Sequence, residues 1–271
     1  MRTLAPALLA VSLLLPAAAR AADDAAPAPA KAAAVATFTP APSGWYVELR
    51  SGTATQTLDD PDANIGFIER FSEDNLGAPG PLRRFGNATA FAGEIGRRRG
   101  AWSWGIEVEH QRQRVKTFAA GTLTGSFDCV SLMAVTDVRL AATIRPRNLY
   151  GFEVGASAGT AYGHYSEHFA IAIYQAPQFD TALSGVYHAT SLSGGAHLGW
   201  RRPLYGNSWL VARAAWSWRK FDKLAGTQTN EFGSGTTNQD LVRLTDGKTA
   251  SIDATGFQFT AGLSHTFGGR R

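Results

Sequence analysis

The segment GFQFTAGLSHTF (Gly256–Phe267) alternates apolar and polar side chains and ends on an aromatic residue. Successive side chains of a β-strand point to opposite faces, so this period of two predicts a strand whose two faces meet different surroundings. The alternation alone does not say which face contacts protein and which contacts lipid or water. The apolar parity consists of Phe257, Phe259, Ala261, Leu263 and Phe267.

Seven earlier segments have the same period, so the chain contains eight candidate strands. None of the 12 prolines falls inside them, as the hydrogen-bonded ladder of a sheet requires. The connections alternate in length, which predicts an antiparallel up-and-down meander with short turns at one end. Short connections are 97–100, 145–148 and 202–207, and long ones are 55–86, 163–186 and 222–248, with an intermediate one near 119–127. The candidate strands are 44–54, 87–97, 101–111, 130–144, 150–159, 190–200, 210–218 and 256–267.

The polar parity of these strands decides between two kinds of barrel. A soluble, lipocalin-like barrel would place the apolar parity inside and the polar parity in water. Here the polar parity interleaves glycine and serine with acids and arginines and has little lysine, which favours a crowded polar interior. Its charged members are Glu48, Arg50, Glu94, Glu107, Glu109, Asp137, Arg139, Glu153 and Arg213.

Aromatic residues gather at the short-turn ends of the strands, as expected for a girdle at a membrane interface. They are Trp45, Trp102, Tyr150, Trp200, Trp209 and Phe267. The sequence therefore predicts an all-β, eight-stranded antiparallel up-and-down transmembrane β-barrel. The even strand number places both ends on the short-turn, periplasmic side, and a hairpin around Asp246 and Gly247 is then an extension above the membrane.

The N-terminal part of the chain predicts export. Arg2 precedes an apolar run from Leu4 to Leu15, and Ala19 and Ala21 form an A-x-A site, so residues 1–21 have the pattern of a cleaved signal peptide. Residues 22–42 are rich in alanine and proline and predict a periplasmic linker, which leaves 43–271 as the barrel. No later segment is apolar for long enough to be a transmembrane helix.

Two features of the composition restrict the function. The single cysteine, Cys129, excludes an internal disulfide. Without Arg2 and Arg20 of the signal peptide, 24 basic residues face 22 acidic ones, which gives no argument for a nucleic-acid partner.

With these features the chain resembles the small eight-stranded outer-membrane barrels of Gram-negative bacteria, the OmpA-type transmembrane domains and their opacity-protein and OmpX-type relatives. The resemblance covers about 43–267 and rests on the signal peptide, the hairpin rhythm, the girdle and the terminal Phe267. It implies that the last strand, ending at Phe267, is recognised by the barrel assembly machinery. The chain departs from the family pattern at His265, where a tyrosine is common, and in the GGRR that follows Phe267.

The interior of such a small barrel is just wide enough to be filled by its own side chains. We therefore expect the inward acids and arginines to form a structural plug, with Glu107 and Arg139 paired across neighbouring strands. Two alternatives stay open for this interior: a site of proton relay or metal binding, and a narrow channel for small solutes.

Candidate catalytic groups are few. A deacylase-like site would need a serine and a histidine oriented by a carboxylate, and His188 with Ser191 lacks both the acid and the tight spacing. In HYSEH, Glu167 lies between His164 and His168, a weak metal pattern that a polar loop explains better. We expect no catalytic, cofactor or metal site, although a lipid-modifying enzyme (lipid A deacylase or acyltransferase-like) stays open as an alternative.

The expected function is a structural and surface-interaction role in the cell outer membrane, through long extracellular loops. Outer-membrane lipids and lipopolysaccharide are the expected partners, together with an unknown extracellular ligand. The acidic first long connection is a candidate for contact with calcium-bridged lipopolysaccharide or a host ligand. The arginines of the short turns are expected beside phospholipid head groups: Arg97, Arg98, Arg99, Arg145, Arg147, Arg201 and Arg202.

Overall fold

The computed structural model describes residues 43–56, 58–76, 82–120, 125–146, 151–174, 180–231 and 235–267. The signal peptide and linker predicted for 1–42 lie outside these residues, as do Arg147, Tyr150 and the GGRR of 268–271.

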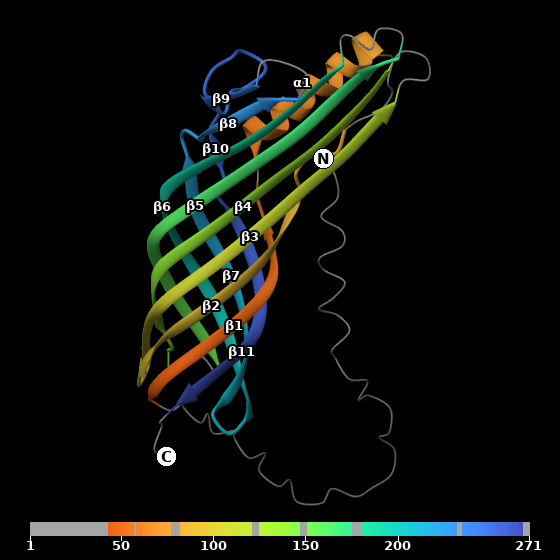
Figure 1. The fold of residues 1–271 in the computed structure, drawn as a ribbon. Coiled ribbons are helices and arrows are strands. Elements are labelled where there is room, and N and C mark those ends of the chain that lie inside the picture. Colours follow the sequence, from red (N-terminus) through yellow and green to blue (C-terminus); the bar gives the residue numbers. More distant parts are fainter. Residues whose placement is uncertain are drawn as a thin grey trace, which may run out of the picture. The chain divides into compact units, whose positions relative to one another are not determined.

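Eight antiparallel strands form a closed ring, which confirms the predicted fold class (Figure 1). From β1 to β7, each strand pairs with the next strand of the ring in sequence. β7 then pairs with β11, and the pairing of β11 with β1 closes the ring. A closed ring leaves no unpaired sheet edge, which is the condition for spanning a bilayer with strands. The strands of the ring are β1 (Gly44–Thr55), β2 (Asn87–Arg99), β3 (Trp102–Ala120), β4 (Gly125–Ile144), β5 (Phe152–Ile173), β6 (Thr181–Tyr205), β7 (Ser208–Phe221) and β11 (Gly256–Phe267).

Several strands extend far beyond the predicted segments at the end with the long connections. The predicted connection 163–186 is mostly strand, because β5 and β6 remain paired from Phe152↔Trp200 up to Ile171↔Thr181. Beyond the reach of β7, the first half of β6 pairs with β8 (Ala225–Asn230), which pairs in turn with β9 (Gly235–Asp240). The two residues of β10 (Ile252–Asp253) pair with the end of β7.

The hairpin predicted around Asp246 and Gly247 is present outside the ring. Gly247 has a φ of 70°, and Val242 pairs with Thr249 across the turn. The hairpin adds no crossing strand, so the interpretation as an extension is confirmed.

The first long connection contains a helix, α1 (Asp59–Leu76), where the sequence predicted only a loop. Three acids in its first turn stabilise the helix, because their negative charges lie at the positive end of the helix dipole. Pro61 is also in the first turn, where a backbone N–H has no hydrogen-bond partner within the helix, so its absence costs little stability. In Figure 1 the helix lies at the opposite end of the barrel from the end of β11. No helix of the described residues is long and apolar enough to span a membrane.

Polar contacts fix α1 to the hairpin that precedes β10. The Asn64 side chain donates to the Val242 carbonyl (3.0 Å) and accepts from the Leu244 amide (2.8 Å). The carboxylate of Asp60 accepts a hydrogen bond from the Ser251 amide (2.8 Å).

The interior has two parts of different chemistry. The part nearer the short turns is filled by ion pairs, and we call it the charged lumen. The part beneath α1 is an apolar cluster that includes Leu58, Ile65, Phe85, Val115, Phe127, Cys129, Met133, Val135, Tyr165, Tyr187, Phe221, Leu241 and Ile252.

Candidate functional site

The charged lumen is centred on Arg213 of β7. Its Nη2 atom lies 3.0 Å from Glu48 and 3.4 Å from Glu153, and its Nη1 atom lies 3.1 Å from both Glu94 and Glu107. The planar guanidinium group offers several donors in a fixed fork, so one arginine can join carboxylates from four strands. All five side chains are almost completely buried.

Further arginines close the network above and below this centre. The Nη2 atom of Arg139 lies 2.5 Å from Glu109 and 3.3 Å from Glu107, which confirms the predicted pair across β3 and β4. Closer to the helix, Arg219 lies 2.7 Å from Asp137 and 2.5 Å from Glu109. The described network balances six carboxylates (Glu48, Glu94, Glu107, Glu109, Asp137, Glu153) with six guanidinium groups (Arg50, Arg139, Arg145, Arg201, Arg213, Arg219).

Little free space remains between these side chains. The cavity beside Arg50, Glu109, Arg139 and Arg213 has a volume of about 10 Å³. A water molecule needs at least about 10–15 Å³ on this measure, so the cavity holds one water at most. The charged lumen is therefore a plug of side chains at this level.

Several residues lie on the other side of the wall from the predicted one. Arg98, Arg145 and Arg201 point into the lumen and are buried, so their predicted position beside lipid head groups is wrong. Trp209 is only 3% exposed and does not belong to the girdle. The parity explains these corrections, because Arg98 shares the parity of inward Glu94, and Trp209 that of inward Arg213.

Arg98 instead lies against the Tyr46 ring, with its guanidinium carbon 4.7 Å from the ring centroid. It also donates to the Thr266 hydroxyl (2.8 Å). The outward arginines Arg97, Arg99 and Arg202 do remain on the surface at this end.

The outer face of the ring is apolar at the level of the charged lumen. Leu140 is 72% exposed and Leu192 69% exposed, whereas the polar parity of the same strands is buried. A soluble barrel would have the opposite arrangement, so for the described strands this alternative is wrong at this level. Other exposed members of the band are Leu49, Phe91, Ile95, Trp104, Ile106, Val108, Val138, Leu198, Phe257, Phe259 and Leu263, with Trp45, Trp102, Phe152 and Phe267 near the short turns.

Comparison with known proteins gives similarity of fold only. No protein-family model matches the chain, and no curated protein matches it. Among solved structures, the chain is similar to Ail, the attachment invasion locus protein of Yersinia pestis (13% identity, 82% of this chain and 99% of that chain, TM-score 0.42). It is also similar to the outer-membrane protein OprG of Pseudomonas aeruginosa (12% identity, 84% and 98%, TM-score 0.42) and to the outer-membrane protease OmpT of Escherichia coli (12%, 85% and 98%, TM-score 0.39).

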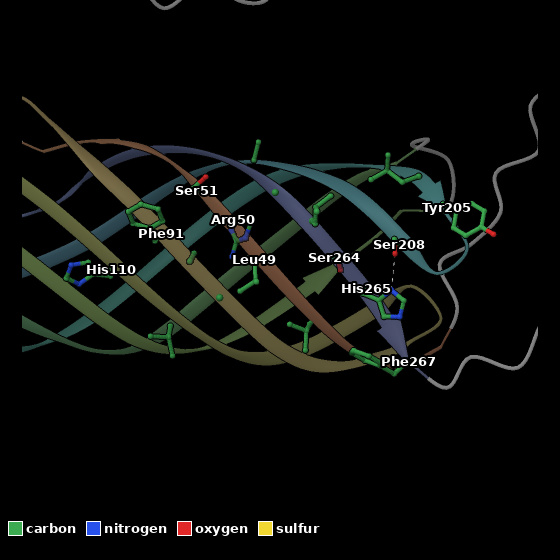
Figure 2. Close-up of a pocket in the computed structure, with 18 residues that line it drawn as sticks. Leu49, Arg50, Ser51, Phe91, His110, Tyr205, Ser208, Ser264, His265 and Phe267 are labelled. Atoms are coloured by element: carbon green, nitrogen blue, oxygen red, sulfur yellow. Dashed lines mark hydrogen bonds between the residues drawn. The ribbon is translucent and has the colours of Figure 1, made fainter.

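An apolar groove of about 1150 Å³ lies on the outer face where β11, β1 and β2 meet (Figure 2). Leu49, Phe91 and Leu263 line it, and Tyr205 stands at its short-turn end. At that end the Ser208 hydroxyl lies 2.9 Å from Nδ1 of His265, as the dashed line in Figure 2 shows. No contact of this pair with a carboxylate occurs among the described residues, and the His265 ring contacts the ring of Phe267 instead.

The other candidate catalytic and metal groups are not brought together. His188 points outward and lies 3.2 Å from His164 and 2.5 Å from the Tyr162 hydroxyl, whereas Ser191 donates to the Lys220 carbonyl. His188 lies within β6, opposite His164 of β5.

The HYSEH pattern of β5 also divides between the two faces of the wall. Glu167 shares the inward parity of Tyr165, away from outward His164 and His168. Within the described part of the chain, no group of three potential metal ligands forms.

Glu167 is the acid that lies against the apolar cluster. The Tyr165 hydroxyl, which belongs to the cluster, donates to its carboxylate (3.1 Å). Burial raises the pKa of Glu167 to about 7, because no cation compensates the loss of water around the charged form. This group lies beyond the apolar band, on the part of β5 that extends above the predicted membrane.

Proposed function

We propose that the chain is a non-enzymatic barrel of the bacterial outer membrane, exported through a cleaved signal peptide. In this proposal the barrel stabilises the membrane and presents the extensions of β5, β6, β8 and β9 for contact outside the cell. The observation that supports it is the charged lumen, in which Arg213 joins four carboxylates from different strands and the cavity beside them has a volume of only about 10 Å³.

The test is a conductance measurement on the refolded protein in a planar lipid bilayer. We expect no stepwise current, because the ion pairs fill the cross-section of the ring. A general diffusion porin in the same bilayer provides the positive control. Stable single-channel steps from this protein would overturn the proposal in favour of the narrow channel.

A second candidate function is a lipid-modifying enzyme, and one observation favours it. The Ser208–His265 pair borders an apolar groove large enough for an acyl chain, and a serine with a neighbouring base is the minimal unit of an acyl-transfer nucleophile. Mass profiles of lipid A and phospholipids from cells with the wild type and with Ser208→Ala discriminate the two functions. We expect identical profiles, and an acyl change that requires Ser208 would favour the enzyme.

A further inference from the structure

Three cations point outward from consecutive positions of one parity of β3. Arg112, Arg114 and Lys116 are all exposed, and they lie about 7 Å apart along the strand. We call them the basic row. Below them, the same parity carries exposed Ile106 and Val108 of the apolar band. Along β3, the row therefore begins where the apolar band ends.

The position of the row matches the length of a membrane crossing. The segment from Ala101, in the turn after β2, to Gln111 has 11 residues, and a tilted strand crosses the hydrocarbon layer in about 9–11. Arg112 is the next residue. The basic row thus lies at the height of lipid head groups on the side of the long connections, which is the outer leaflet in the proposed orientation.

The cations of the row have no acidic partner among the described residues. Across β4 they stand opposite Ala134, Leu132 and Val130. In the charged lumen, by contrast, the arginines of the network lie within 4 Å of a carboxylate. Unpaired cations in a row repel one another, so an anion bound from outside would relieve this repulsion.

A groove of about 590 Å³ lies beside the upper end of the row. It is lined by Arg83, Arg84, Gly86 and Asn87 together with Arg114 and Lys116. The Gln113 side chain holds this segment against β3 by donating to the Gly86 carbonyl (2.6 Å). Arg84 also pairs with Glu69 of α1, so the groove wall is held from two sides. The groove adds a concave surface beside the row, into which a phosphorylated sugar can fit.

We propose that Arg112, Arg114 and Lys116, with the adjoining groove, bind the phosphate groups of lipopolysaccharide in the outer leaflet. A glycolipid with several phosphates matches both features of the surface, because its acyl chains lie along the apolar band while its anionic sugars meet the basic row. A zwitterionic phospholipid has no net charge to match three cations. This inference rests on the proposed outer-membrane location and deepens it by naming the surface that contacts the lipid.

The test is a titration of the refolded barrel in detergent with purified lipopolysaccharide. The variant Arg112→Gln, Arg114→Gln, Lys116→Gln removes the row. The matched control, Arg97→Gln, Arg99→Gln, Arg202→Gln, removes the same charge from the exposed surface at the short-turn end. We expect the row variant to bind at least about tenfold more weakly and the control to stay within about twofold of the wild type. The heat-dependent shift in electrophoretic mobility shows that each variant is folded.

Two further arms identify the ligand chemistry. Lipopolysaccharide with its phosphates removed should bind the wild type as weakly as the intact lipid binds the row variant. Arg112→Lys with Arg114→Lys should keep most of the affinity, since it retains the charge. Equal affinities of the row variant and the control overturn the assignment. Current steps in the bilayer experiment would instead overturn the proposed function, so the two failures are distinguishable.

Discussion

The two parts of the interior, the charged lumen and the apolar cluster, share the same strands but follow opposite rules. Around Arg213 the inside is ionic and the outside apolar. Around Phe127 and Met133 the inside is apolar, and α1 covers it with Ile65. The lower part thus has the arrangement of a membrane barrel, and the upper part has the apolar interior that is typical of a soluble one.

Strand β3 shows the exchange most directly. Its inward parity changes from Glu107 and Glu109 to Val115, while its outward parity changes from Val108 to Arg112 and Lys116. The strand keeps its period of two throughout. Its outward face changes from apolar to polar near His110, and its inward face changes from polar to apolar between Gln113 and Val115. The inversion marks the height at which the surroundings of the wall change from lipid to water, because each face must suit its solvent.

The two parts should therefore respond differently to the loss of one side chain. Arg213→Ala should destabilise the folded barrel by about 3–5 kcal/mol, because it leaves four buried carboxylates without their shared cation. The measurement is the free energy of unfolding in urea, with the barrel in lipid vesicles. It is the largest effect that we expect from a single substitution.

The matched change in the apolar cluster is Met133→Ala, at a fully buried position of β4. The loss of apolar contact should cost about 2–3 kcal/mol, at the lower end of the usual range for a buried methionine replaced by alanine. An unfolding free energy for Arg213→Ala equal to that of the wild type would contradict the ionic plug and end the comparison.

A change of pH should have a smaller effect on stability, and only in the part of the barrel that contains the apolar cluster. The pKa of Glu167 is raised from 4.5 to about 7, so the folded state binds the proton more tightly than the unfolded state. Its contribution to stability is therefore complete below about pH 4.5 and is lost as the pH rises through 7. The loss should be about 1–3 kcal/mol, because this side chain is only partly shielded from water.

Hydrogen exchange of the β5 and β6 amides above the membrane, at pH 5 and pH 8, measures this change. Glu167→Gln should remove the difference between the two pH values. His168→Gln removes the neighbouring outward titratable group and is the control. A pH dependence that persists in Glu167→Gln would assign it to another group.

The sequence predicted the ring because the period of two is a local property of each strand. The inward position of Glu107 and Arg139 followed from parity, and their ion pair confirms it. By the same parity, Arg98 and Trp209 face the interior. Near the turns, the chemistry of arginine and tryptophan favours a place beside lipid head groups, but the position in the alternation decides which side of the wall these residues face.

The extensions above the membrane have no clear local pattern in the sequence. In β5 the HYSEH segment has polar residues on its outer parity, so it is typical of a loop until its inner partner Tyr165 is seen to pack against Tyr187. The helix α1 depends on contacts of Asp60 and Asn64 with residues about 180–190 positions away. No local pattern contains these contacts.

The smallest expected difference in stability is between two lipid-facing residues at opposite ends of β11. Phe267 and Phe257 are exposed to similar extents, 52% and 59%. Replacing either with alanine should cost the folded barrel about 1 kcal/mol, since each side chain keeps only part of its surface in contact with protein. The two variants should therefore unfold at nearly the same urea concentration.

Assembly in cells should separate these two variants. Phe267 ends the last strand and pairs with Trp45 of β1 at the closing seam, where the resemblance to small outer-membrane barrels implies recognition by the assembly machinery. We expect Phe267→Ala to lower the amount in the outer membrane several-fold, and Phe257→Ala to leave it near the wild-type level, as measured by quantitative blotting of membrane fractions. Equal amounts of the two variants would show that the terminal aromatic contributes only apolar surface, with no special role in recognition.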